Sequence, residues 1–195
     1  MPVVRANILP SNFLEISKQI QVRGATMNMH ILIEFEIART DWSRIAAIEG
    51  AATNVPHALR ELIYAQSSGE ANRAYWKLEN HVVVQGQLFE AAVYIVPVLL
   101  AALASSELPR FVGISIVELL FQIVHGDAAS EDVARGLPDL GDCCRTEAKK
   151  GLWLLYRELI AGDLPKEGVL EVIEVIDDDK NRVAFIKSAA IPAAD

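Results

Sequence analysis

The side chains of this sequence that could act as nucleophiles or metal ligands are few and lie far apart. Ser115 follows Gly113 as in half of a nucleophile elbow, but the second glycine is missing and the segment is predicted to be one continuous helix. Cys143 and Cys144 are adjacent, with no histidine close to them, so they lack the spacing of zinc ligands. No glycine-rich loop that could hold a phosphate or a dinucleotide is present. The sequence therefore predicts no catalytic residue, no metal site and no cofactor.

Carboxylates are the chemical groups that this chain concentrates most strongly. Between positions 158 and 179 there are eight acidic residues and one base, Lys166. Two neighbouring acids can serve general acid–base catalysis when their pKa values differ, but a solvated acidic face is the simpler interpretation. Such a face speeds association with a cationic partner, whereas the alternative is a polar cap that keeps the end of a helical stack in solution. The acids that we expect to bind a partner are Glu171, Glu174, Asp177, Asp178 and Asp179, together with Glu34 and Glu36.

Two aromatic pairs could anchor a partner. Tyr75 and Trp76 are adjacent, so one is expected inside and the other exposed, and we assign the exposed anchor to Trp76. For Trp153 and Tyr156 the same two interpretations are open, and packing in the core is favoured over exposure as an anchor.

The element that must position these side chains is a helical repeat. Val55-Pro56 and the apolar residues that follow recur as Val96-Pro97 and its successors, at an offset of 41 residues. A period near forty with apolar residues at helical spacing indicates stacked helix pairs. A third copy is predicted in a helix that contains Ala148, Leu152, Leu155 and Leu159 and ends at Gly162.

Local signals place the individual elements. A proline or a capping residue opens predicted helices near residues 53–63, 67–82 and 110–125. A further helix is predicted over residues 88–103, kinked or restarted near Pro97. Two more are predicted at 166–176 and 180–190, with a hairpin as the alternative for this last pair. A short helix is expected from Trp42 to Gly50. Before it, residues 11–21 are predicted to be helical, and the alternation of residues 31–37 predicts a strand that would pair with residues 2–9.

We therefore predict an all-α, HEAT-like α-solenoid of about six or seven stacked helices over residues 41–195. Residues 1–40 are predicted to be a short N-terminal extension that contains a strand or a hairpin.

The order of motifs resembles a known family. Asp41-Trp42, Gly50, Asn54-Val55-Pro56, Gln85-Gly86-Gln87-Leu88-Phe89 and Val96-Pro97 follow one another as in the bacterial HEAT-repeat-like proteins, over residues 41–162. Many members of that family accompany secreted toxins as presumed immunity proteins. Members often have His-Gln-Gly where this chain has Val84-Gln85-Gly86, so no role of that histidine is carried over. The resemblance implies a protein-binding solenoid whose partner is a toxin.

Composition limits the partners further. The net charge of the 195 residues is −8, which disfavours phosphate-driven nucleic-acid binding and favours a basic protein partner. Residues 1–5 lack the basic and apolar run of a secretory signal, and no stretch is long enough to cross a membrane, so a cytoplasmic protein is expected.

Two alternative functions remain open. The first is a HEAT-like alkylpurine DNA glycosylase, which needs a basic concave face, and the second is an assembly scaffold or homo-oligomer with an exposed apolar patch on its terminal helices. The bases available for the glycosylase are Arg60, Arg73, Lys77, Arg110, Arg145, Lys149 and Lys150.

Overall fold

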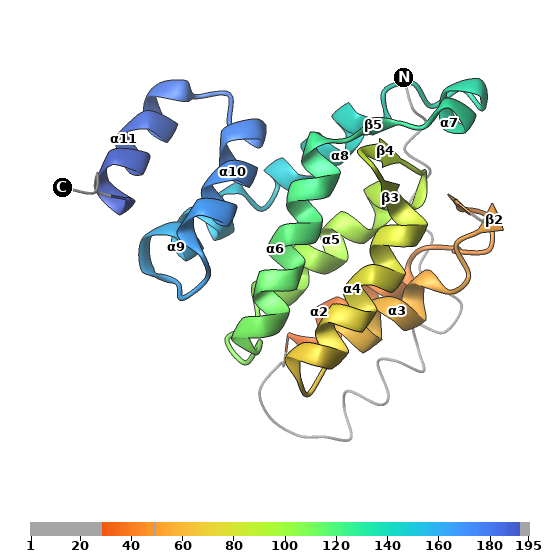
Figure 1. Ribbon diagram of the computed structural model, residues 1–195, viewed down its shortest axis with the longest axis horizontal. Coiled ribbons are helices and arrows are strands. Elements are labelled where there is room, and N and C mark those ends of the chain that lie inside the picture. The colour runs from red at the N-terminus through yellow and green to blue at the C-terminus, as the bar shows by residue number, and fades with distance from the viewer. Residues whose placement is uncertain (1–28, 49, 192–195) are drawn as a thin grey trace.

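The computed structural model describes residues 29–48 and 50–191, and within them the protein is all-α (Figure 1). The expected helix over residues 11–21 and strand over residues 2–9 lie outside this part of the chain. The described helices are α2 (His30–Ala38), α3 (Val55–Ile63), α4 (Ser68–Val82), α5 (Ala91–Leu103), α6 (Arg110–His125), α7 (Ser130–Ala134), α8 (Leu140–Lys149), α9 (Leu152–Ala161), α10 (Lys166–Ile176) and α11 (Lys180–Ala190). The described strands are two residues each: β1 (Ala46–Ala47), β2 (Gly50–Ala51), β3 (Val83–Val84), β4 (Gln87–Leu88) and β5 (Asp127–Ala128).

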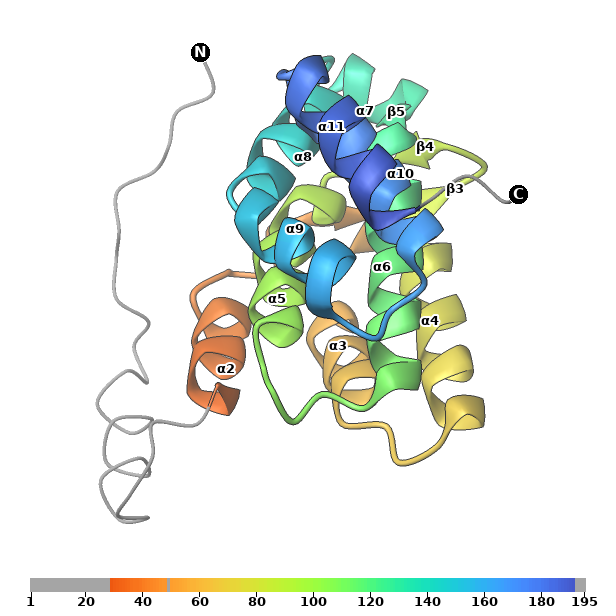
Figure 2. The same cartoon turned by 90° about the vertical axis from the view of Figure 1, so that its left-hand side faces the viewer.

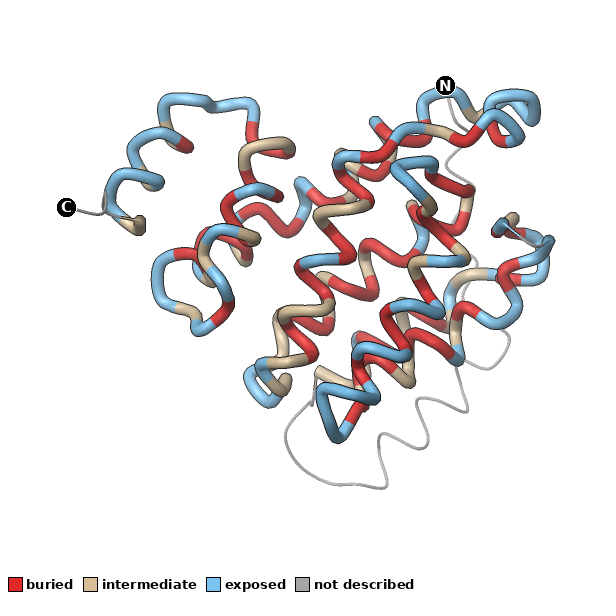
Figure 3. The backbone as a smooth tube through the Cα atoms, in the orientation of Figure 1, coloured by how far each residue is buried: buried red, intermediate tan, exposed pale blue. Residues whose placement is uncertain are grey.

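The helices pack in two layers. In one layer α6 lies between α4 and α10, and in the other α5 lies between α2 and α8. Helix α3 pairs with α4, and α9 pairs with α10. The buried side of each helix faces the junction of the layers, whereas α11 packs on α10 at the end of the stack and is largely exposed (Figures 1 and 3). The predicted class, an all-α stack of helix pairs, is confirmed.

The sequence signals located the first helix pair correctly. Pro56 lies in the first turn of α3, where a missing amide proton breaks no intrahelical hydrogen bond. Ser67 is the N-cap of α4, and its hydroxyl accepts a hydrogen bond from the Glu70 amide. The five buried residues of α4 are those of the predicted apolar face, namely Ala71, Ala74, Tyr75, Leu78 and Val82.

The later helices follow the predicted bounds closely. Helix α6 covers Arg110–His125, and most of its surface is covered by α4, α5, α8 and α10, as an almost entirely apolar helix requires. The segment from Lys166 to Ala190 forms the helix pair α10 and α11 rather than a hairpin.

The strand predicted over residues 31–37 is wrong, because these residues form helix α2. Ile33 and Ile37, one helical turn apart, are both buried, and α2 packs against α5. The alternation of apolar and polar residues misled the prediction because Ile31 and Phe35 lie beside this buried pair and are themselves half-buried. A segment assigned to the N-terminal extension therefore contributes to the core.

The short helix expected from Trp42 to Gly50 is also wrong. The Trp42 indole donates a hydrogen bond to the Ile37 carbonyl (2.8 Å), and the Ala46 amide donates one to the Glu90 carboxylate (3.1 Å). Strands β1 and β2 then pair antiparallel, and Gly50 has a φ of +108°, in the left-handed region. A side-chain bond to the end of α2, a bond to Glu90 and a short hairpin thus replace the hydrogen bonds of a local helix.

The single long helix expected up to Gly162 is interrupted. Helix α8 ends at Lys149 and α9 begins at Leu152, so Gly151 lies at the break. A side chain at Gly151 would overlap that of Leu100, which explains why a residue without a side chain lies where the two helices approach α5. Together with α2 and α7, this division raises the helix count of the described residues to ten, above the six or seven predicted.

A small sheet joins three helix ends. Strands β3 and β4 form a hairpin whose two turn residues, Gln85 and Gly86, have φ values of 52° and 78°, typical of a type I′ turn. Strand β5, which follows α6, pairs parallel with β4, with Asp127 opposite Gln87. This sheet ties the end of α4, the start of α5 and the end of α6 together.

Candidate protein-binding surface

The predicted acids on α2 are engaged within the chain. Glu34 accepts hydrogen bonds from the guanidinium of Arg60 (2.7 Å) and the hydroxyl of Tyr64 (3.2 Å), which ties α2 to α3. Glu36 pairs with Arg39 (2.8 Å), and burial raises the pKa of its carboxyl above the usual value. Glu34 therefore holds α2 against α3, whereas the pair formed by Glu36 lies within α2 and its C-cap.

Asp177 is buried instead of lying on the surface expected for it. Its carboxylate accepts hydrogen bonds from the Tyr156 hydroxyl (2.6 Å), the Arg182 Nε (2.8 Å) and the Asp179 amide (2.9 Å). Hydrogen bonding to Arg182, more than any other cause, holds the pKa of Asp177 well below its usual range. The carboxylate joins α9, α10 and α11.

The rest of the Asp177–Asp179 run has structural roles as well. Asp178 is exposed and pairs with Lys149 at the end of α8. Asp179 is the N-cap of α11, where its side chain accepts a hydrogen bond from the Arg182 amide (3.1 Å). The run therefore organises the start of α11.

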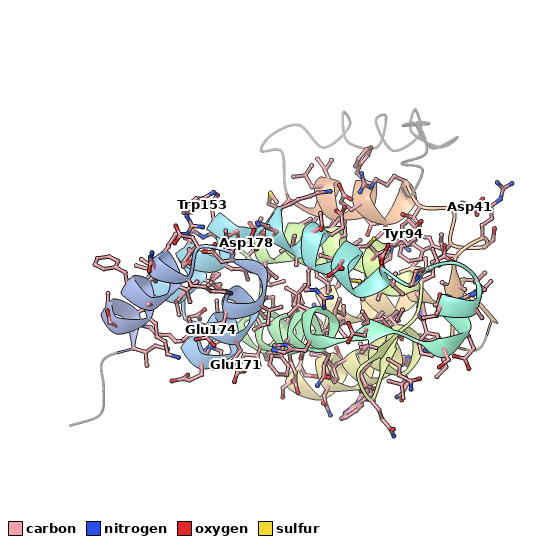
Figure 4. All side chains as sticks on the ribbon, turned by 90° about the horizontal axis from the view of Figure 1, so that it is seen from above. Asp41, Tyr94, Trp153, Glu171, Glu174 and Asp178 are labelled. Atoms are coloured by element: carbon pink, nitrogen blue, oxygen red, sulfur yellow. The ribbon has the colours of Figure 1, made fainter. Side chains whose placement is uncertain are left out.

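Glu171 and Glu174 remain on the surface of α10. Glu171 is exposed, and Glu174 pairs with Lys187 of α11 (2.9 Å). Figure 4 shows both on one side of the C-terminal end, with Trp153 and Asp178 on the other side. The structure thus separates residues that the sequence grouped together.

Trp76 lies on the same helix layer as Glu171 and Glu174. Its side chain is 51% exposed on α4, and the buried Tyr75 ring packs against it edge to face, with 5.3 Å between ring centroids. Burial, together with the negative charges of Glu118 and Glu79, raises the pKa of Tyr75 to about 12. Both acids are therefore close to this aromatic pair.

The next two helices extend the acidic surface. Gly113 lies against Leu164, and Gly168 lies near Val117, so α6 and α10 run in the same direction at a matched register. Glu118, next to Val117, is exposed, and the exposed Glu171 lies one helical turn after Gly168 on α10. We call the surface of α4, α6 and α10 formed by Trp76, Glu79, Glu118, Glu171 and Glu174 the acidic face.

The exposure of Trp153 was not predicted. The side chain is 69% exposed, and the Arg182 guanidinium lies over its ring at 5.3 Å from the centroid. Tyr156, by contrast, is buried as expected. The exposure of Trp153 could have been predicted from the sequence. Leu152, Leu155 and Leu159 recur at helical spacing and form the buried side of α9, and Trp153 lies outside that side.

The seven bases considered for nucleic-acid binding do not form one basic surface. They are divided between α3, α4, α8 and the start of α6, and so between both layers. Six of them are held by partners within the chain: Arg60 by Glu34, Lys77 by Glu61, Arg110 by Asp163, Arg145 by Asp142, Lys149 by Asp178 and Lys150 by Glu147. The basic concave face that a HEAT-like glycosylase needs is not assembled by these residues.

Other features that could form a site are a surface depression and two cysteines. An open depression of about 600 Å³ lies between the β1–β2 hairpin and α7, and no predicted site residue lines it. No group of three or more potential ligands there or elsewhere in residues 29–48 and 50–191 is arranged to hold a metal ion. Cys143 and Cys144 are free thiols, and burial raises the pKa of Cys144 to about 12. None of the helices described is both long and apolar enough to cross a membrane.

Comparisons of this chain with models of protein families, with curated proteins and with solved structures gave no match.

Proposed function

We propose that this protein is a helical-repeat module that binds a basic protein through its acidic face. The observation that carries the proposal is that an exposed tryptophan and four carboxylates lie on three adjacent helices of one layer. Tryptophan anchors a partner by burying a large surface, and the surrounding carboxylates attract cations and discriminate against acidic proteins. The net charge of −8 adds to that attraction at long range.

The resemblance of residues 41–162 to HEAT-repeat-like immunity proteins supports a more specific form of this proposal. In that form the partner is a basic toxin in the cytoplasm, and the solenoid neutralises it by covering its active site. The mechanism is steric and electrostatic, and it requires no catalytic group on this chain. This specific form depends on the resemblance, whereas the partner's charge follows from the acidic face.

The experiment is capture of partners by the tagged full-length protein, followed by affinity measurements over a salt series. We expect a single stoichiometric basic protein whose affinity falls as the salt concentration rises, because screening weakens the attraction of exposed charges. The double variant Glu118→Lys with Glu171→Lys should weaken binding at least about tenfold and flatten the salt dependence. Capture of nucleic acid in place of a basic protein would contradict the proposal.

A matched control changes the net charge equally at another place. Glu131 and Asp139 are exposed residues of α7 and of the turn before α8, outside the acidic face. The variant Glu131→Lys with Asp139→Lys should retain most of the affinity. An equal loss in both double variants would show that net charge alone, and not the acidic face, determines binding. Co-expression with the captured partner then tests the toxin directly, because only a toxin impairs growth when this protein is absent.

A further inference from the structure

Two carboxylates of the acidic face have no partner, although many acids of this chain are paired. Glu61, for example, is held by Lys77. By contrast, Glu79 of α4 and Glu118 of α6 make neither a side-chain hydrogen bond nor an ion pair in the part of the chain that the structure describes. Glu79 is half-buried, and this burial raises the pKa of its carboxyl above the usual value. A half-buried carboxylate without a counter-charge is an acceptor for a cation from outside the chain.

The hydroxyl of Tyr75 is a third group without a partner at the same place. Tyr75 is only 4% exposed, yet its hydroxyl makes no hydrogen bond within residues 29–48 and 50–191, which is unusual for a buried polar side chain. The fully enclosed side-chain atoms without a partner in those residues belong to Glu36 and Asp132, so the Tyr75 hydroxyl reaches solvent. Burial, and then the negative charges of Glu118 and Glu79, raise the pKa of this hydroxyl. It therefore lies on the side of α4 that faces α6, close to both carboxylates.

Trp76 adds an aromatic surface beside these three acceptors. Its exposed ring is nearly perpendicular to that of Tyr75, with an interplanar angle of 82°. Figure 2 shows α4 and α6 side by side, so the ring and the acceptors belong to one region of the surface. The bases of α4 are directed elsewhere, because Lys77 pairs with Glu61 of α3 (2.8 Å) and the charge of Arg73 acts on the same carboxylate. No base of α4 therefore neutralises the acceptors that face α6.

We propose that Trp76, Glu79, Glu118 and the Tyr75 hydroxyl bind one arginine side chain of the basic partner. This inference rests on the proposed function, because it names the group that the acidic face receives. A guanidinium is planar, so it stacks on an indole ring while its N–H groups donate hydrogen bonds to the surrounding oxygens. A lysine ammonium is more strongly hydrated and has no plane to stack, so it binds such a site less well. We call these four residues the arginine site.

The probe for the arginine site is blocked arginine, acetyl-arginine methylamide, added to the full-length protein, with blocked lysine as the comparison. The three tryptophans give three indole N–H signals in an NMR spectrum, and the variant Trp76→Phe identifies the signal of Trp76 by its absence. We expect this signal to shift saturably, with a Kd for blocked arginine on the order of 1 mM, as for a ligand of this size. The Kd for blocked lysine should be at least about threefold higher.

Three substitutions test the acceptors one at a time. Glu79→Gln and Glu118→Gln each remove one negative charge, so each should weaken binding of blocked arginine at least about threefold. Tyr75→Phe removes only the hydroxyl and should weaken binding about twofold. It should leave the unfolding temperature unchanged, because this hydroxyl has no partner in the described part of the folded chain.

Glu171→Gln is the matched control for the two glutamate variants. Glu171 is exposed and has no partner within the described residues, but it lies on α10, whereas the arginine site lies on α4 and α6. This variant should bind blocked arginine like the wild type.

The outcomes separate the arginine site from the proposed function. The absence of a saturable shift of the Trp76 signal, equal affinities for blocked arginine and blocked lysine, or equal losses in Glu118→Gln and Glu171→Gln would each overturn the arginine site. The proposed function would still stand if a captured basic protein lost affinity in the double variant Glu118→Lys with Glu171→Lys. Conversely, specific binding of blocked arginine without capture of a basic protein would support the arginine site and contradict the proposed function.

Discussion

Replacing Asp177 with asparagine should lower the free energy of unfolding by about 3 kcal/mol, because it removes one member of a buried ion pair and leaves the others without a counter-charge. The wild-type carboxylate bonds Tyr156, Arg182 and the Asp179 amide, so the substitution weakens the junction of α9, α10 and α11 at once. Denaturant unfolding followed by tryptophan fluorescence measures the loss, and Trp153 reports on it locally because Arg182 lies over its ring.

The neighbouring residue provides the control for this variant. Asp178 has the same charge, but its side chain is exposed and its pair with Lys149 is on the surface. Asp178→Asn should therefore cost no more than about 1 kcal/mol. Equal losses in the two variants would show that the general charge of the segment, and not the buried contacts of Asp177, stabilises this end.

The same carboxylate makes the C-terminal end sensitive to acid. Its pKa is lower in the folded protein than the usual value of about 3.9 in an unfolded chain, so the unfolded state takes up a proton first as the pH falls. The stabilisation by Asp177 is complete above that unfolded value and is lost as the pH falls toward the folded one. The difference in unfolding free energy between wild type and Asp177→Asn should thus be constant from neutral pH to about pH 5 and shrink below it. A difference that grows in acid would contradict the assigned pairing.

Leu120→Ala should destabilise the whole stack, by about 2–5 kcal/mol. Leu120 is fully buried on α6, the helix that packs against α4, α5, α8 and α10. The lost side chain leaves a cavity where most of the repeat contacts meet, so all probes of unfolding should shift together. Hydrogen exchange can separate this result from that of Asp177→Asn, in which only α9–α11 should exchange faster.

The control for Leu120→Ala lies on the same helix. Glu118 is exposed, so Glu118→Ala should change stability by no more than about 0.5 kcal/mol. Destabilisation confined to one helix pair in Leu120→Ala would contradict the central role of α6.

The helices that the sequence located well are those with local stop and start signals. Pro56, the Ser67 cap and the apolar spacing of α4 act within a few residues, so they are readable without tertiary structure. The bounds of α6, α10 and α11 were predicted correctly for the same reason, because Pro109, Pro165 and Asp179 mark where these helices begin. Residues 31–37 show the limit of this reasoning, because alternation and helical spacing overlap in a short apolar segment, and only packing against α5 decides between them.

The candidate site was less predictable than the fold. Trp76, Glu171 and Glu174 could be selected from composition, but Glu79 and Glu118 join them only through the packing of α4 against α6. Asp177 shows the opposite case. An aspartate in an acidic run was expected in solvent, and its burial depends on Arg182 and Tyr156, which lie on two other helices.

The small sheet of β3, β4 and β5 has a mechanical consequence. Backbone hydrogen bonds from the Asp127 amide to Gly86 and from the Ala129 amide to Leu88 fasten the end of α6 to the hairpin between α4 and α5. The sheet therefore restrains relative movement of these helix ends, whereas the connections from α3 to α4 and from α5 to α6 contain no strand. If the stack closes on a partner by bending, this sheet is therefore the fixed point about which the helices rotate.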